Sequence, residues 1–447
     1  MNNTLLGIRC IELPPSWKSG VKNNFINFMI FQQELTEKDI IEILKYAKKE
    51  GIINPRPITR KIFEFASILH PRLFFSAKKE GNLFTITPDL QQFITSIRKG
   101  KLNKRYKNLE RFDLSQEYYN SLLFLAGCTL SAAIIQNRYA EGTIDSKLNR
   151  LWQYLHFREK EYGSSKEIES FKNQIIQIGN DTHESQLNKL KQIKKLYAHI
   201  FQSISQNLLS FKPKLISAQK LSSADQEKFG FTEDLKNSLG ENLVAIFVYG
   251  SSVTSKVFND YDVIIVVKDE DQAFEKLQGT NPSFQGFDIN LSVYSIENFK
   301  VYQIYSGDNL DNNVICIYGE VEIPVKSKEV LVLRNFSFAI IRLRQLLGMA
   351  SFLSQEGKHF GLSGNENIYH YFIKIPMHIT KGVRSAYGDP IDKEIINDWT
   401  KQQFNYSIDQ QMQLCEENRT WEAIANAYIA TLNVMDALNE EYHFIKF

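Results

Sequence analysis

LVAIFVYGSSVTSKVFNDYDVIIVV, residues 243–267, holds two apolar runs of strand length on either side of a polar segment. An uninterrupted apolar run of this length, rich in β-branched residues, is typical of a strand that is covered on both faces. The first run stops at Gly250 and Ser251, and the second begins around Asp260 and Asp262. We therefore expect the glycine, the serine and both aspartates to gather at one edge of a sheet.

Asp260 and Asp262 are spaced so that both carboxylates project from the same face of a strand, while Tyr261 faces the opposite way. Two carboxylates held that close repel each other, and a divalent cation removes the repulsion. Mg²⁺ binds characteristically through one or two carboxylates and substrate phosphates, and Mn²⁺ accepts the same oxygen ligands. Two such ions, roughly 3.5 to 4 Å apart, can activate an attacking hydroxyl and stabilise a leaving pyrophosphate. The pattern predicts a Mg²⁺ site.

A third carboxylate and a turn extend this pattern. Asp288 lies in an alternating segment, residues 287–294, that we expect to form a strand beside the one bearing Asp260. Gly250 allows a backbone to approach a triphosphate without a Cβ in the way, and the Ser251 hydroxyl can donate to phosphate oxygens. Positioning and charge neutralisation of this kind serve phosphoryl transfer. The alternative is an ordinary Gly-Ser turn beside aspartates that only solvate a sheet edge, and the combination of all three features favours a site.

The arrangement of these motifs resembles the polymerase β-like nucleotidyltransferase superfamily. Its signature is an apolar residue, Gly-Ser or Gly-Gly, a short spacer and Asp-x-Asp on the next strand, and the match covers residues 243–294. The resemblance implies a metal-dependent transfer of a nucleoside monophosphate from a nucleoside triphosphate to a hydroxyl acceptor. The matching positions imply roles for Gly250 and Ser251 as nucleotide-phosphate contacts, for Asp260 and Asp262 as ligands of both metals, and for Asp288 as the third carboxylate, a metal ligand and the base toward the acceptor.

The spacer between the two strands departs from one branch of that superfamily. Residues 252–259 are fewer than in antibiotic-modifying members, and Thr254-Ser255-Lys256 replaces their Ala-Arg-Gly. This difference argues against an antibiotic as the acceptor. Lys256 is a candidate phosphate contact, with a solvated loop lysine as the alternative.

The rest of the chain suggests an α+β protein that is mostly α, with a small mixed-sheet nucleotidyltransferase domain flanked by helical regions. We predict a mixed α/β N-terminal region in residues 1–110, a helical region in 111–215, the catalytic domain in 216–328 and a C-terminal helical bundle in 329–447. In the helical region, the apolar pattern predicts helix almost throughout residues 115–210.

The N-terminal region carries the pattern of a winged helix, as one interpretation. Apolar residues at helical spacing predict helices over residues 36–50 and 59–69, and residues 73–76 and 83–86 are expected to form a hairpin, after an irregular start. A helix–helix–hairpin order is typical of winged helices.

The composition and net charge of the chain limit which binding partners are expected. The 447 residues carry a formal charge of only +2, so no global charge demands nucleic acid or a membrane surface. Four scattered cysteines and the lack of a leader-like start or a long apolar run predict a cytoplasmic protein without a membrane partner.

Basic residues concentrate in one place, residues 98–107, where six lysines and arginines surround a single tyrosine. This run is either a solvated linker or a contact surface for a nucleic-acid backbone. Together with the large N-terminal half, it favours a macromolecular acceptor, an RNA end or a protein side chain. The alternatives are a small hydroxyl compound as acceptor and a non-catalytic, nucleotide-binding interaction protein.

A rival motif lies in the helical region. Arg150 and His156 resemble the arginine–histidine pair of the HEPN nucleases. Residues six apart on a straight helix are separated by about 240° around the axis, so the two side chains do not converge unless the helix ends between them. We expect an ordinary helix here.

Overall fold

The computed structural model describes residues 5–12, 16–18, 25–33, 35, 37–52, 55–60, 78–80, 116–137, 139, 142–208, 214–222, 226–255, 258–305, 310, 314–325, 328, 331–332, 334–336, 338–339, 341, 373–389, 391–417 and 420–443. The chain divides into two units. The first unit comprises residues 1–118, 339–380 and 397–447, and the second unit comprises residues 119–338 and 381–396.

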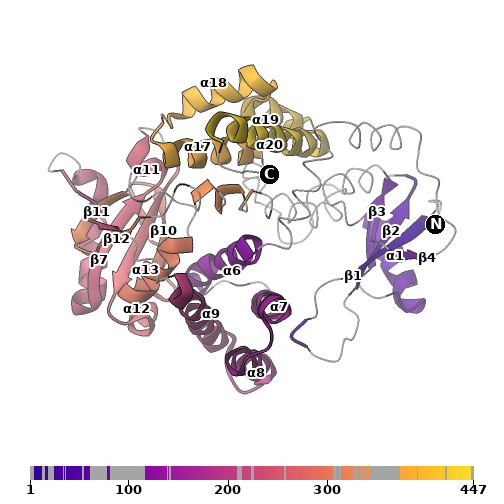
Figure 1. The fold of residues 1–447 in the computed structure, drawn as a ribbon, viewed down its shortest axis with the longest axis horizontal. Coiled ribbons are helices and arrows are strands. Elements are labelled where there is room, and N and C mark those ends of the chain that lie inside the picture. Colours follow the sequence, from indigo (N-terminus) through magenta and orange to yellow (C-terminus); the bar gives the residue numbers. More distant parts are fainter. Residues whose placement is uncertain are drawn as a thin grey trace. The chain divides into compact units, whose positions relative to one another are not determined.

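The second unit contains a six-stranded mixed sheet (Figure 1). Its strand order is β6 (Gln219–Lys220), β11 (Val314–Gly319), β7 (Leu243–Tyr249), β8 (Asp260–Val267), β10 (Phe287–Ser295) and β9 (Ser283–Phe284). β8 pairs antiparallel with β7 and parallel with β10. The predicted strands at residues 243–249, 263–267 and 287–294 are therefore confirmed, and the expected neighbour of the Asp260 strand is β10.

The middle of the sheet is buried on both faces, as its apolar sequence predicts. Every residue of β8 from Val263 to Val267 is buried. The helices α10 (Thr232–Leu239), α12 (Glu270–Leu277) and α13 (Ile296–Tyr305) pack against the strands. Between β7 and β8, the described residues form the short helix α11 (Ser251–Thr254). This arrangement leaves the polar residues before Val263 at an edge of the packed core.

Four long helices complete most of the second unit. They are α6 (Gln116–Gln136), α7 (Thr143–Tyr162), α8 (Lys166–Asn180) and α9 (Gln186–Leu208), so the prediction of an almost wholly helical stretch is confirmed. Helices α7, α8 and α9 contact one another, and their apolar faces bury Leu151, Ile175 and Tyr197. These helices lie in the same unit as the six-stranded sheet.

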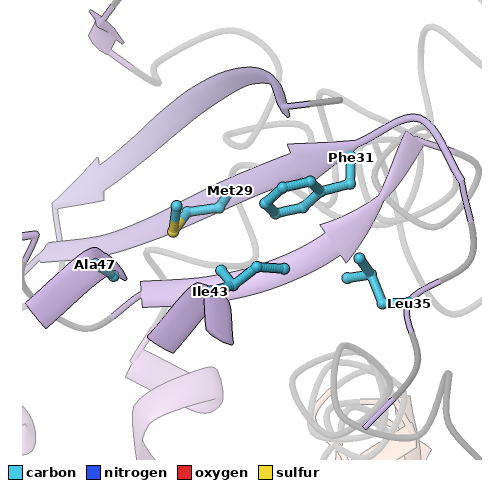
Figure 2. Close-up of a cluster of buried hydrophobic side chains, with 5 residues drawn as sticks. All are labelled: Met29, Phe31, Leu35, Ile43 and Ala47. Atoms are coloured by element: carbon cyan, nitrogen blue, oxygen red, sulfur yellow. The ribbon is translucent and has the colours of Figure 1, made fainter. Parts of the chain in front are cut away.

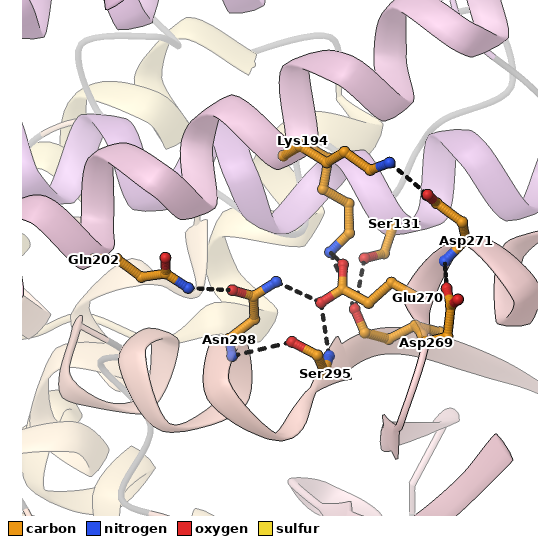
Figure 3. A network of polar contacts seen from close by, with 10 residues as sticks. Ser131, Lys194, Gln202, Asp269, Glu270, Asp271, Ser295 and Asn298 are labelled. Carbon is orange, nitrogen blue, oxygen red and sulfur yellow. Dashed lines mark hydrogen bonds and ion pairs between the residues drawn. The ribbon is translucent and has the colours of Figure 1, made fainter.

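A buried polar network joins these helices to the sheet (Figure 3). The Lys194 ammonium on α9 lies 3.1 Å from a Glu270 carboxylate oxygen and donates to the Val293 carbonyl of β10. Glu270 also accepts hydrogen bonds of 2.6 Å from the Ser295 backbone N–H and the Asn298 amide. Burial raises the pKa of Glu270, but the Lys194 charge and these donors outweigh burial and hold the pKa below its ordinary value.

The first unit contains a four-stranded sheet at the N-terminus. Its order is β3 (Pro55–Thr59), β2 (Phe25–Phe31), β1 (Leu5–Glu12) and β4 (Lys78–Glu80), and the helix α1 (Glu37–Lys49) packs beside β3. A cluster of buried side chains from β2, α1 and the segment between them forms its core, namely Met29, Phe31, Leu35, Ile43 and Ala47 (Figure 2). The predicted helix over residues 36–50 is confirmed by α1.

The N-terminal sheet corrects the expectation of an irregular start. β1 and β2 pair antiparallel along most of their length, and β2 is buried on both faces at Met29 and Ile30, so it lacks the alternation that marks a half-buried strand. Thr59, the expected first residue of the second helix, ends strand β3. Residues 61–77 and 81–115 are outside the described part of the chain, so the rest of that helix, the predicted hairpin and the basic run at 98–107 stay predictions.

The C-terminal part is helical, as predicted. It contains α17 (Ile375–Tyr387), α18 (Lys393–Phe404), α19 (Ile408–Glu416) and α20 (Thr420–Tyr442). Helices α19 and α20 pack together around a small core of Ile373, Tyr406 and three alanines of α20. The protein is thus an α+β structure with a six-stranded mixed sheet and a C-terminal helical region. Within the described ranges, none of the helices combines the length and apolar character needed to cross a membrane.

Candidate metal and nucleotide site

Asp260 and Asp262 begin strand β8 on one face, as the spacing predicts. Both are half-buried, whereas Tyr261 between them is fully buried and faces the other side of the sheet. Because β8 turns into its apolar run directly after Asp262, both carboxylates lie where the packed core ends. The structure therefore places the two predicted ligands side by side.

Asn290 of β10 contacts both carboxylates. The register of the parallel pair sets Asn290 opposite Asp262. The Asn290 amide nitrogen lies 2.8 Å from Asp260 Oδ2 and 3.4 Å from Asp262 Oδ1, so it donates to both. A neutral amide donor therefore lies between two anions that would otherwise repel.

Asp288 is in register with Asp260 on the neighbouring strand, and its side chain is exposed. Paired residues on adjacent strands project to the same face, which puts Asp288 on the face of the two aspartates. Among the residues that the structure describes, however, no three His, Cys, Asp or Glu side chains are arranged to hold a common metal ion. The roles of Asp288 as a metal ligand and base therefore stay predictions, and Asn290 is the β10 side chain seen in contact with Asp260 and Asp262.

Gly250 shapes the end of β7 next to Asp262. Its φ of 79° and ψ of −151° belong to a region that is essentially restricted to glycine. A Cβ built on this residue would lie 2.6 Å from Asp262 Oδ2, closer than real atoms approach. Both the backbone angles and the space therefore require glycine here, and the turn brings Gly250 directly against the Asp262 carboxylate.

The residues after Gly250 form one helical turn, α11. Ser251 begins it and is half-buried, while Ser252 is fully buried and its hydroxyl donates to the Tyr249 carbonyl at 3.3 Å. The structure thus brings Gly250 against Asp262, and Ser251 is the next residue of the same turn. Lys256, the other candidate phosphate contact, is outside the described residues, so its role stays a prediction.

Lys228, in the 3₁₀ turn η2 (Glu227–Phe229), braces this turn from the other side of β8. Its ammonium donates to the Ser252 carbonyl. Its own carbonyl accepts a 3.1 Å hydrogen bond from the Tyr261 hydroxyl. Lys228 therefore links the strand that carries both aspartates to the turn that carries Gly250.

Aromatic side chains surround Tyr261 on that side. Phe231, Phe258 and Phe287 place their rings 5.2, 5.0 and 6.1 Å from the Tyr261 ring, in edge-to-face orientations. Such pairs stabilise beyond simple burial. Burial also raises the pKa of the Tyr261 hydroxyl, which stays a hydrogen-bond donor at neutral pH. The residue between the aspartates is thus an anchor that fixes the start of β8.

The residues fit a divalent cation. Two half-buried carboxylates share a face, and Asn290 contacts one oxygen of each. Asp262 Oδ2 lies in the space that a glycine leaves open. Mg²⁺ typically uses one or two carboxylates and completes its shell with water and substrate phosphates, so these two aspartates suffice as its protein ligands.

The sequence interpretation passed over two residues of this site. Asn290 follows Asp288 by two positions, so the strand period alone indicates that it shares the aspartate face. Lys228 carries no such signal, because its contact with Ser252 joins segments that are distant along the chain. The arginine–histidine pair that resembles the HEPN nucleases lies in an ordinary helix, as expected, since α7 is continuous through Arg150 and His156.

Comparison with known proteins assigns no family to this chain. A scan against models of known protein families and a search of curated proteins found no match to the chain. The resemblance to polymerase β-like nucleotidyltransferases therefore stays a prediction that rests on the site residues.

Proposed function

We propose that this protein is a Mg²⁺-dependent nucleotidyltransferase that moves a nucleoside monophosphate from a nucleoside triphosphate to a hydroxyl acceptor. The observation that carries the proposal is the placement of Asp260 and Asp262 side by side at the start of β8, with Asp262 against the Gly250 turn. A carboxylate pair beside a glycine turn brings a cation and a triphosphate to the same place. The resemblance of residues 243–294 to the polymerase β-like superfamily gives this pairing its chemical meaning.

Each residue has a role in this reaction. Asp260 and Asp262 hold the divalent cations, which neutralise the phosphate charge and lower the barrier to attack when bound. Gly250 and Ser251 contact the phosphates, and Asp288 takes the proton of the acceptor hydroxyl. The acceptor oxygen forms a bond to the α-phosphorus, the bond between the α-phosphorus and its bridging oxygen breaks, and pyrophosphate leaves. The products are the nucleotidylated acceptor and pyrophosphate, with no net oxidation or reduction.

The favoured acceptor is macromolecular, an RNA end or a protein side chain. The basic run at residues 98–107 supports a nucleic-acid acceptor, and the spacer at residues 252–259 differs from that of antibiotic-modifying members. The first unit also adds a separate folded sheet, for which a small-molecule transferase has no need. Two alternatives remain as outcomes of the tests, namely transfer to a small hydroxyl compound and nucleotide binding without turnover.

Labelling identifies both the activity and the acceptor. The protein is incubated with each of the four nucleoside triphosphates labelled at the α-phosphate, with Mg²⁺ and with total RNA or cell lysate. Label in RNA or in a protein band supports the proposal, whereas label in small molecules supports the antibiotic-type alternative. Tight nucleotide binding without label in any fraction would support the interaction-protein alternative.

The Asp260→Ala/Asp262→Ala double variant tests the site itself. We expect it to lose transfer while folding normally, because both side chains lie outside the buried core of β8. Without metal its thermal stability should stay close to that of the wild type or rise, since two adjacent anions are removed. Asp234→Ala, an exposed aspartate on α10, is the matched control and should keep full activity. Near wild-type turnover by the double variant would rule out this metal site.

A further inference from the structure

We propose that Asn290 is a positioning residue that clamps Asp260 and Asp262 together and so prepares them for the divalent cation. This inference rests on the proposed function and adds a residue to its site. The Asn290 amide contacts Asp260 Oδ2 at 2.8 Å and Asp262 Oδ1 at 3.4 Å. It is the β10 residue opposite Asp262 in the register of the sheet.

The chemistry of the amide matches this role. A carboxamide nitrogen carries two hydrogens, so one nitrogen can donate to two acceptors at once. Asn290 contacts one oxygen of each aspartate, and an ionised carboxylate has about four lone-pair sites in all. The clamp therefore reduces the repulsion between the anions without occupying all of their ligand positions.

Other side chains at position 290 would lack this property. An ionised aspartate has no donor and would add a third negative charge, and a serine has a single hydrogen to donate. The amide is also exposed, so its place on β10 contributes little to burial in the core. A polar side chain that is exposed and yet bonded to both predicted ligands has its main effect on those ligands.

Hydrogen-bond partners of metal-ligating carboxylates fix their orientation. Loss of such a partner typically lowers metal affinity or activity about 10- to 100-fold. We therefore expect Asn290→Ala to bind the cation more weakly because Asp260 and Asp262 are free to separate. Asn290→Asp should instead make the apo protein less stable and increase the stabilisation that the cation provides.

The test measures Mn²⁺ binding to the full-length protein by electron paramagnetic resonance, with the metal alone. Circular dichroism melting with and without Mn²⁺ is recorded for each variant. We expect Asn290→Ala to bind Mn²⁺ about 10- to 100-fold more weakly than the wild type. Asn290→Asp should melt at a lower temperature without metal and show a larger rise with Mn²⁺. Ser292→Ala, two residues along the same face of β10, is the matched control and should match the wild type in both measurements.

The outcomes separate this inference from the proposed function. If Asn290→Ala binds Mn²⁺ as tightly as the wild type while the wild type transfers nucleotides, the clamp is wrong and the proposed function stands. A Ser292→Ala variant weakened to the same extent would also overturn the clamp, because a general disturbance of β10 would then explain the loss. If the wild type neither binds Mn²⁺ nor transfers nucleotides, the clamp and the proposed function are both wrong.

Discussion

At Gly250, both the backbone angles and the surrounding atoms require glycine. Its φ and ψ suit glycine alone, and a side chain would collide with Asp262. Gly240, at the other end of β7, has a φ of 55° and a ψ of −133° but no atom within contact distance of an added Cβ. Substitutions at the two glycines therefore distinguish the effect of backbone strain from that of pushing the Asp262 carboxylate aside.

We predict that Gly250→Ala and Gly240→Ala both destabilise the protein by about 1–3 kcal/mol, because each forces alanine into a conformation that it rarely adopts. Only Gly250→Ala should also abolish transfer, since its methyl group must push Asp262 away. Chemical denaturation measures the stability, and label transfer measures the activity. Equal activity in the two variants would show that the contact with Asp262 has no part in the reaction.

At this scale the sequence predicted where the two aspartates lie relative to each other and to Gly250. The shared face of Asp260 and Asp262 follows from the strand period, and the structure confirms it. The contact of Asn290 with both carboxylates could not be read from the sequence alone, because it depends on how β8 and β10 align. A shift of one residue in that register would turn Asn290 to the opposite face.

Among the elements, the turn η2 contacts α11 and β8 through one residue, Lys228, whose ammonium donates to Ser252 and whose backbone carbonyl accepts from Tyr261. We expect Lys228→Met to raise KM for the nucleoside triphosphate with a smaller change in kcat, because the Gly250 turn loses its support from Lys228 at Ser252. Loss of a charged hydrogen bond corresponds to about 1.5–3 kcal/mol. Steady-state kinetics provides the measurement.

Two further variants make the Lys228 result specific. Lys228→Arg keeps a positive donor and should recover part of the affinity. Lys236→Met removes a lysine of α10 that pairs with the exposed Glu233, and it should leave KM unchanged. A Lys228→Met variant with wild-type KM would show that η2 does not support the turn.

The Lys194–Glu270 pair attaches α9 to the sheet, and it differs from its neighbour in burial. Lys194 and Glu270 are 4% and 14% exposed, whereas Lys195 and Asp271 are 60% and 42% exposed. We predict that Glu270→Gln destabilises the protein by about 3–5 kcal/mol, because a buried ammonium loses its counter-ion. Asp271→Asn, the matched control, should cost less than about 1 kcal/mol.

The pH dependence of this difference follows from the lowered pKa of Glu270. The folded protein holds the carboxylate ionised more strongly than the unfolded chain does, so its contribution is fully present above the ordinary glutamate pKa of 4.5. The contribution is lost as the pH falls through the lower pKa of the folded state. Denaturation at several pH values should therefore show the gap between wild type and Glu270→Gln closing in acid, and a constant gap would contradict the ion pair.

The elements that the sequence predicted differ from those that it missed in the pattern of their apolar residues. β7, β8 and α1 have long apolar runs or clear helical spacing, and all three were predicted. β1 was missed because Gly7 and Arg9 interrupt its apolar residues, and β2 because its apolar run, residues 28–31, is too short to distinguish a strand from a helix. Both segments become strands by pairing with each other. Pairing with other strands, which a single sequence does not display, determines whether such segments form strands.

At the scale of the whole molecule, the basic run at residues 98–107 is the candidate surface for binding the acceptor. If residues 98–107 track a nucleic-acid backbone, neutralising Lys101, Lys104, Arg105 and Lys107 should weaken acceptor binding for every sequence. Each lost phosphate contact reduces the slope of log affinity against log salt by roughly 0.7–0.9. Nucleotide binding should survive. Affinity measured at several salt concentrations decides the point, and identical slopes for both proteins would remove this run from the acceptor site.

The central claim, transfer of a nucleoside monophosphate by the Asp260–Asp262 site, is tested most directly by comparing two labels in one reaction. The protein is given Mg²⁺, acceptor and a nucleoside triphosphate labelled at either the α- or the γ-phosphate. We predict that the α-label appears on the acceptor and the γ-label in pyrophosphate in equal amounts, and that both signals vanish in the Asp260→Ala/Asp262→Ala variant. Label from the γ-phosphate on the acceptor, or equal signals from the double variant, would contradict the account.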